Sequence, residues 1–158
     1  MTVPTAEFGF LTRSIALAVE AAAAGNRPFG AVMVAADGTV LAEGRNEVAS
    51  AGDITAHAEL AAIRRATADG HADRFAGSTM YASGEPCPMC AAACVWAGVT
   101  RIVFAASTEA FSAILTDGPH FTLGCADLVA ATDAEIDVTG PVHEQEALAA
   151  MRSSITSG

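Results

Sequence analysis

The sequence predicts a three-layer α/β/α domain, in which helices cover both faces of a mixed five-stranded sheet. Short apolar runs rich in β-branched residues alternate with longer segments of helical periodicity along most of the chain. The first two runs are joined by the hairpin dipeptide Asp37-Gly38, whereas later runs are separated by helical segments, the crossovers that parallel strands need. With 158 residues, 52% of them apolar, residues 1–158 are expected to bury roughly two thirds of their unfolded surface as a single domain.

The first half of the chain is expected to open with an amphipathic helix. Leu11, Ile15 and Val19 recur at helical spacing, and Gly25-Asn26 ends the pattern. Thr55 is expected to cap a second helix, which follows the hairpin. The elements expected in this half are a helix over 5–24, strands over 29–36 and 39–44, a polar loop over 47–53 and a helix over 55–69.

The second half continues the alternation of strands and helices. Pro88 suits the first position of a helix, where its missing N–H costs nothing, and Gly98 suits the end of that helix. The pattern weakens over 108–133, where one short helix and irregular loops are expected. The other elements expected here are strands over 78–82, 101–105 and 136–139, helices over 88–97 and 144–151, and a frayed polar tail over 153–158.

Charge and hydropathy exclude several classes of function. The chain has 8 basic residues, all arginine, against 18 acidic residues, a formal charge of −10. Such a surface gains no general attraction to phosphate backbones or anionic lipids, so a small neutral ligand is expected and nucleic acid is disfavoured. The N-terminus lacks the basic start and apolar core of a secretory signal, and residues 15–24 are interrupted by Glu20 and too short to span a bilayer. A cytoplasmic protein is therefore expected.

The residues with evident chemistry gather in two short motifs. His57-Ala58-Glu59 lies at the start of one predicted helix, and Cys87 and Cys90 lie at the start of another. Imidazole and thiolate are standard Zn²⁺ ligands, and three protein ligands leave the fourth tetrahedral position to water, as in catalytic zinc sites. The sequence therefore predicts one zinc ion per subunit, held by His57, Cys87 and Cys90. Cys94 lies one helical turn beyond Cys90, but a site closed by a third cysteine would leave Glu59 without a purpose.

The position of the first motif at a helix end decides what Glu59 can do. Side chains two residues apart on a regular helix point in opposite directions, so His57 and Glu59 share a pocket only at the helix end. There the carboxylate is expected to take a proton from the water that zinc acidifies. A Cys-x-x-Cys redox pair and a zinc-stabilised binding module without turnover remain as alternatives. Cys94 and Cys125 are expected to be ordinary buried residues, and His120 is assigned no role.

The pattern His-x-Glu followed by Pro-Cys-x-x-Cys resembles that of the zinc deaminases of the cytidine deaminase-like superfamily. The similarity extends over Arg27–Val32, Asn46, Glu85–Cys90 and Trp96, and it is closest to bacterial guanine deaminases and related nucleobase deaminases. The resemblance implies a cytidine deaminase-like fold, a homodimer and hydrolytic removal of an exocyclic amine from a free nucleobase or related heterocycle, with release of ammonia. It also implies that Glu59 moves protons from water to the ring and to the departing ammonia.

The tRNA adenosine deaminases carry the same motifs and remain as the alternative function. They typically have Pro-Val-Gly-Ala and Pro-Cys-Val-Met-Cys segments. In this chain, Phe29 and Pro88 stand in place of the two valines. The acidic net charge also disfavours tRNA, because proteins that bind tRNA usually present a basic surface.

The resemblance further implies which residues contact the substrate. Asn46 would bind the base edge, the Ala58 backbone N–H would meet a ring carbonyl, and Phe29 and Trp96 would wall the ring. These residues also have ordinary explanations, Asn46 as a turn residue and the aromatic residues as core. The acidic candidates later in the chain, which solvation or a helix dipole explains equally well, are Asp117, Glu144 and Glu146.

The C-terminal segment departs from the guanine deaminases, which carry an aromatic-rich segment that closes over the base. Residues 151–158 contain no aromatic residue, so this lid is expected to be changed or absent. Guanine is therefore one candidate substrate beside cytosine-like pyrimidines, aminotriazines and modified purines.

Overall fold

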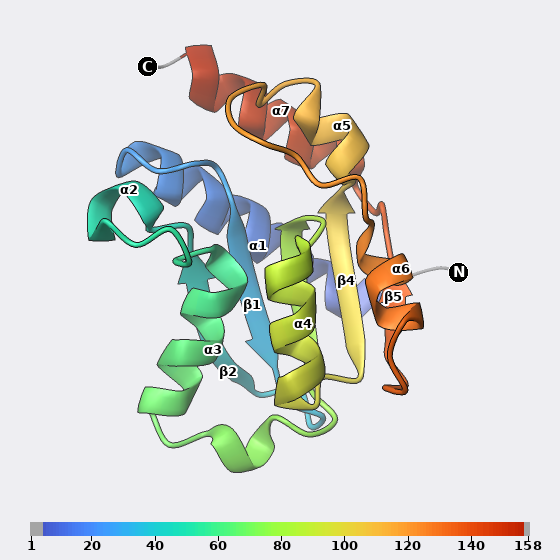
Figure 1. Ribbon diagram of the computed structural model, residues 1–158. Coiled ribbons are helices and arrows are strands. Elements are labelled where there is room, and N and C mark those ends of the chain that lie inside the picture. Colours follow the sequence, from blue (N-terminus) through green and yellow to red (C-terminus); the bar gives the residue numbers. More distant parts are fainter. Residues whose placement is uncertain (1–4, 157–158) are drawn as a thin grey trace.

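A five-stranded sheet forms the middle layer of the molecule, as the computed structural model describes it for residues 5–156 (Figure 1). The strands lie in the order β2 (Val40–Arg45), β1 (Gly30–Val34), β3 (Thr79–Gly84), β4 (Arg101–Ala106) and β5 (Asp137–Thr139). β1 pairs antiparallel with both β2 and β3, whereas β3, β4 and β5 run parallel. The predicted mixed sheet, antiparallel at the opening hairpin and parallel later, is confirmed.

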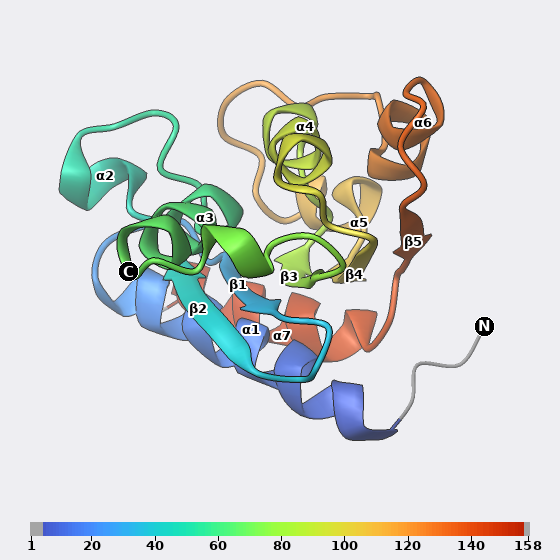
Figure 2. The same cartoon turned by 90° about the horizontal axis from the view of Figure 1, so that it is seen from below.

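Helices cover both faces of this sheet, as the view along it shows (Figure 2). One layer contains α3 (Ala58–Ala68), α4 (Pro88–Ala97) and α6 (Cys125–Ala130), and the other contains α1 (Thr5–Ala23) and α7 (Glu144–Thr156). Side chains of β1 alternate between the two layers, because successive residues of a strand point to opposite faces. Ala31 and Met33 belong to the core under α3 and α4, and Val32 and Val34 to the core over α1 and α7. None of the helices within residues 5–156 is long and apolar enough to cross a membrane.

Three short segments differ from the prediction. Part of the predicted loop 47–53 forms the one-turn helix α2 (Val48–Ala51), and residues 108–133 contain α5 (Thr108–Ser112) as well as α6. The predicted frayed tail is helical as far as Thr156, because it continues α7, whose buried residues Ala147, Leu148 and Met151 pack the helix into the core. Residues 157–158 of that tail lie outside the described residues.

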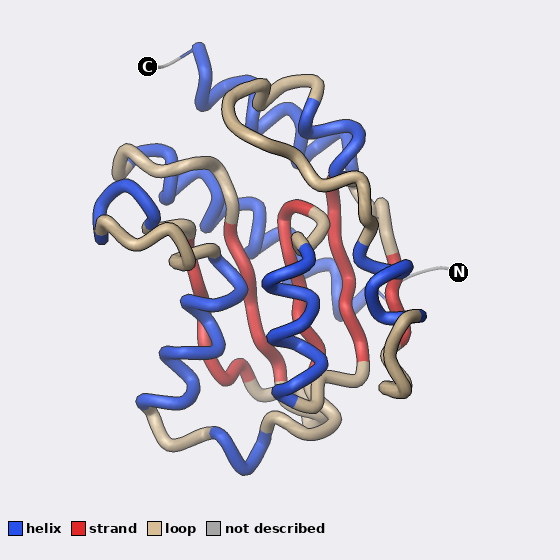
Figure 3. Tube along the Cα trace, in the orientation of Figure 1, coloured by secondary structure: helices blue, strands red, loops and turns tan. Residues whose placement is uncertain are grey.

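The topology brings several chain ends to one edge of the sheet. Because β1 is antiparallel to its two neighbours, the carboxyl ends of β2, β3 and β4 lie at the same edge as the start of β1. Figure 3 shows the loops that leave this edge, including the long one over 113–124. Residues that follow these strands therefore meet there although they are distant in the sequence.

Close packing fixes the first turn of α3 at this edge. A Cβ atom on Gly44, in β2, would lie 2.0 Å from the backbone oxygen of Ala58, the first residue of α3. Only glycine allows the strand and the helix to approach so closely. The residues beside Ala58, His57 and Glu59, are thereby held at a set position relative to the sheet.

Candidate active site

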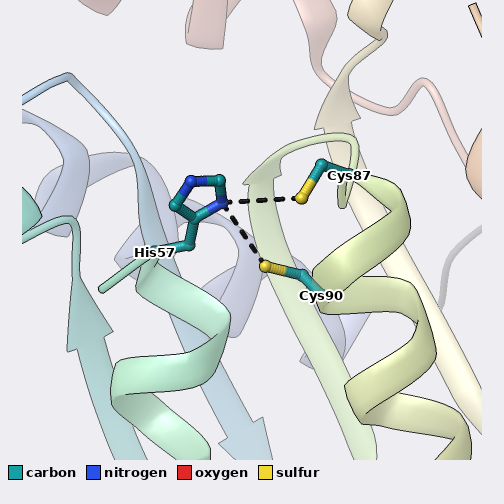
Figure 4. Close-up of side chains that lie close together, drawn as sticks. All are labelled: His57, Cys87 and Cys90. Atoms are coloured by element: carbon teal, nitrogen blue, oxygen red, sulfur yellow. Dashed lines mark hydrogen bonds between the residues drawn. The ribbon is translucent and has the colours of Figure 1, made fainter. Parts of the chain in front are cut away.

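The three predicted metal ligands lie at the N-termini of two neighbouring helices. His57 is the N-cap residue of α3 and Cys87 is the N-cap residue of α4, and both have extended backbone conformations. Cys90 lies in the first turn of α4. The His57 Nδ1 atom lies 3.5 Å from the Cys87 Sγ atom and 3.5 Å from the Cys90 Sγ atom (Figure 4).

These distances fit a zinc ion. All three ligand atoms lie within 4.8 Å of one another. Tetrahedral zinc with bonds of about 2.0 Å to nitrogen and 2.3 Å to sulfur separates those two atoms by about 3.5 Å. In the described part of the chain, His57, Cys87 and Cys90 form the one such group of possible ligands, and Cys94 is not a member of it. The three-ligand site that the sequence predicts is therefore the arrangement that the fold provides.

The two sulfur atoms have opposite protonation tendencies. A hydrogen bond from the Cys90 thiol lowers the pKa of Cys87 to about 4, and a hydrogen bond with His57 contributes to the same shift. The same bond, together with burial, raises the pKa of Cys90 far above its ordinary value. A divalent cation bound by both sulfurs would displace the thiol proton, as thiolate ligation requires.

Glu59 is a buried carboxyl group beside these ligands. Its residue is only 6% exposed, and it lies in the first turn of α3, two residues after His57. Burial, followed by the negative charge of Cys87, raises the pKa of Glu59 above its ordinary value. A buried carboxyl group with a raised pKa, beside possible metal ligands, is suited to accept a proton and to return it.

A cavity of about 420 Å³ opens over these residues, within the range of small-molecule sites. Phe29 and Phe111 meet edge to face in its wall, with ring centroids 5.2 Å apart. The lining is mostly apolar around a few polar groups, and it consists of Arg27, Phe29, Asn46, Ile54, His57, Ala58, Glu59, Glu85, Cys87, Pro88, Thr108, Phe111, Pro119, His120, Phe121 and Leu123.

Asn46 and Ala58 each present an N–H group in the lining. The Asn46 Oδ1 atom accepts the Val48 N–H at 3.1 Å, so the donor group of this buried side chain is its amide NH₂. The Ala58 N–H is the first of α3 and has no acceptor within the helix. Asn46 is thus a turn residue and a pocket residue at once.

Four of the predicted substrate contacts lie outside this cavity. Trp96 is 89% exposed near the far end of α4, at least two turns from Cys87, and it does not line this cavity. Asp117 is exposed and absent from the lining. The Glu144 carboxylate accepts the Ser107 N–H, and Glu146 lies beside His143, so both acids are engaged away from the pocket.

Residues 108–123 contribute a wall of the cavity that was not predicted from the sequence. This segment supplies Thr108, Phe111, Pro119, His120, Phe121 and Leu123. Its aromatic and proline residues were the available signal, but without periodicity they could not be placed. An aromatic residue over the pocket therefore comes from this loop, while the C-terminal residues continue α7 instead.

Comparisons with known proteins agree with this geometry. Residues 6–106 match the family described as "Cytidine and deoxycytidylate deaminase zinc-binding region". The guanine deaminase of Bacillus subtilis is 44% identical over 110 residues, which cover 68% of this chain and 70% of that protein. A probable cytosine deaminase of Schizosaccharomyces pombe is 30% identical over 145 residues, 90% of this chain and 88% of that protein.

Solved structures and longer relatives extend the comparison. The structure of a guanine deaminase from Nitrosomonas europaea superimposes with a TM-score of 0.81 at 27% identity, over 99% of this chain and 87% of that one. The chain spans only 25% of a tRNA(Ile)-lysidine synthase of Deinococcus deserti, at 38% identity over 142 residues. It spans 59% of a tRNA-specific adenosine deaminase of Agrobacterium fabrum, at 44% identity over 91 residues. With the family match over most of its length and the His/Cys/Cys group in place, the chain belongs to the cytidine and deoxycytidylate deaminase family of zinc-binding proteins.

Proposed function

We propose that residues 1–158 form one zinc-dependent deaminase domain that hydrolyses the exocyclic amine of a free nucleobase or related amino-heterocycle and releases ammonia. The observation that carries this proposal is the buried Glu59 carboxyl group beside three metal ligands at the base of a mostly apolar cavity. A binding module or a redox pair has no use for such a carboxyl group, whose burial costs free energy. Metal analysis combined with an ammonia assay separates those alternatives from an enzyme.

The proposed roles follow from the positions of the groups. Bound zinc supplies a Lewis acid that lowers the pKa of a water molecule. Glu59 would accept one proton from that water and donate it to a ring nitrogen as the C–O bond forms. It would then take the second proton from the new hydroxyl group and pass it to the amine, which leaves as ammonia when the C–N bond breaks. The Asn46 NH₂ group and the Ala58 N–H orient the base through its acceptor atoms, and Phe29 contacts the ring.

The substrate class is proposed to be a planar, neutral base. The cavity is lined largely by apolar side chains, and the chain carries a net charge of −10. Relatives named guanine deaminase and probable cytosine deaminase support this class. We expect the zinc-loaded protein to release ammonia from at least one member of a panel of guanine, cytosine, isocytosine, adenine, ammeline and their nucleosides. Zinc-loaded protein that acts on none of them would contradict the proposal.

Deamination of adenosine in tRNA is the second candidate, and the match to the Agrobacterium fabrum tRNA-specific adenosine deaminase favours it. Binding to tRNA requires cationic contacts with phosphates and weakens steeply with added salt. A gel shift with tRNA at several salt concentrations distinguishes the two. Salt-sensitive retardation together with inosine formation would replace the free-base proposal.

A homodimer through α4 is part of the proposal. Every residue of α4 that is not buried is apolar: Met89 and Trp96 are exposed, and Pro88, Ala92, Ala93, Val95 and Ala97 are half-buried. A second copy of this chain is the occupant we infer, because a helix without any charged residue can meet its own copy across a two-fold axis with no charge left unpaired.

Trp96→Glu is expected to convert the dimer to a monomer. The substitution places a charge, twice by symmetry, at the centre of the inferred interface, where its desolvation is costly. Sedimentation velocity at micromolar concentration measures the change, with Glu109→Gln, on the exposed surface of α5, as the control. Wild-type protein that sediments as a monomer contradicts the dimer without touching the catalytic proposal.

A further inference from the structure

Glu85 joins two helices that begin on either side of the pocket wall. It follows the end of β3 and precedes the metal ligand Cys87 by two residues. Its Oε1 atom accepts the backbone N–H of Thr108 at 2.9 Å, and its Oε2 atom accepts the backbone N–H of Cys125 at 2.8 Å. Thr108 is the first residue of α5, and Cys125 is the first residue of α6.

A carboxylate is well suited to this position. The first N–H groups of a helix have no partner within it and carry partial positive charge, so one anion can satisfy two helix starts at once. Gly124 permits the approach, since a Cβ atom there would lie 3.2 Å from the Glu85 Oε2 atom. The Glu85 backbone is itself held by its N–H, which donates to the Ala106 oxygen at 2.7 Å and extends the sheet.

The two helix starts bracket the segment that walls the cavity. Residues 116–123 of that segment are exposed, and the bond between His120 Nε2 and the Leu115 oxygen lies within the segment itself. The position of Phe121 and its neighbours relative to the metal ligands therefore depends on how the two ends are attached. Both ends are attached to the side chain of Glu85.

We propose that Glu85 is a positioning residue that sets the pocket wall, residues 108–123, at a fixed place over the metal site and so determines how tightly the base is bound. The inference rests on the proposed function and deepens it. Glu85 acts on binding through the wall, while Glu59 carries the proton transfers.

Glu85→Gln tests this assignment without changing the size of the side chain. Glutamine has one acceptor oxygen, so its NH₂ group must face one of the two backbone N–H groups, and one end of the wall is released. Glu144→Gln is the matched control. Glu144 accepts a single backbone N–H, from Ser107 at 2.8 Å at the start of the same helix α5, and one amide oxygen suffices for that bond.

The expected result is a split between KM and kcat. Loss of one charge-assisted hydrogen bond at the wall should raise KM about tenfold, with kcat within about threefold of wild type and one zinc ion per subunit retained. Hydrogen exchange should accelerate in peptides that cover 107–115 and 124–130 but not in α3. The Glu144→Gln variant should keep wild-type values in every measurement.

Three results would overturn the assignment. They are wild-type KM and exchange in Glu85→Gln, a loss of zinc in that variant, or an equal change in Glu144→Gln. Should Glu85→Gln fail to fold, Glu85→Asp keeps the charge but is too short to reach both N–H groups, and the same split is expected. If wild-type protein releases no ammonia from any base, the proposed function fails, while faster exchange in the variant still supports the anchoring and unchanged exchange refutes it.

Discussion

Glu59→Gln is expected to lower kcat by a factor of about 10² to 10⁴ while one zinc ion per subunit remains bound. Glutamine has nearly the same shape as glutamate but can neither accept nor return a proton. Because burial raises the pKa of Glu59, the neutral amide also removes a carboxyl group that is costly to ionise in the folded protein. Thermal stability should therefore stay equal or rise, which separates a lost proton carrier from a damaged fold.

Steady-state ammonia release, zinc content and a thermal melt of the same preparation measure these effects. Glu109→Gln is the matched control, since Glu109 also lies in the first turn of a helix but is exposed and outside the cavity. It should keep wild-type kcat. If the Glu59→Gln enzyme kept more than about a tenth of the wild-type kcat, Glu59 would not be the residue that transfers the protons.

Helix α4 shows why parts of the fold were predictable to the residue. Its start is marked by Pro88 at the first helical position and its end by Gly98, which adopts a left-handed conformation with φ of 84°. Both signals are local. The start of α3 was predicted at Thr55 and lies at Ala58, because the Thr55 hydroxyl donates to Asp53 at 2.7 Å within the preceding turn, and His57 becomes the N-cap residue.

The candidate site divides in the same way. His57, Cys87 and Cys90 could be predicted because ligand type and short spacing carry the chemistry, and helix ends bring the two motifs together. The pocket wall could not be predicted. Phe121 and Leu123 belong to a loop without periodicity. In the arrangement proposed above, their position depends on two backbone N–H groups that donate to Glu85, which is distant in sequence. Trp96 is the opposite case: the family resemblance assigned it to the pocket, but it lies exposed near the far end of α4, outside the cavity.

Removal of zinc is expected to abolish ammonia release and to destabilise the fold. The N-termini of α3 and α4 converge at the His57, Cys87 and Cys90 ligand atoms, so the metal links two helices of the same layer. A ligand present at a thousand times its Kd stabilises the folded state by about 4 kcal/mol. For a domain of this size, the loss should lower Tm by roughly 10 °C. Added Zn²⁺ should restore both activity and Tm.

A pair of cysteine variants tests whether this effect belongs to the three-ligand site. Cys90 and Cys94 are both fully buried on α4, one turn apart, but only Cys90 belongs to the ligand group. Cys90→Ser should lose most zinc and all measurable turnover, because a buried hydroxyl is a far weaker zinc ligand than a thiolate. Cys94→Ser should keep one zinc ion per subunit and its activity, with only the modest loss of stability that a buried hydroxyl brings. Equal zinc loss in the two variants would mean that Cys94 closes the site, and a fully active metal-free protein would mean that the ion has no part in the chemistry.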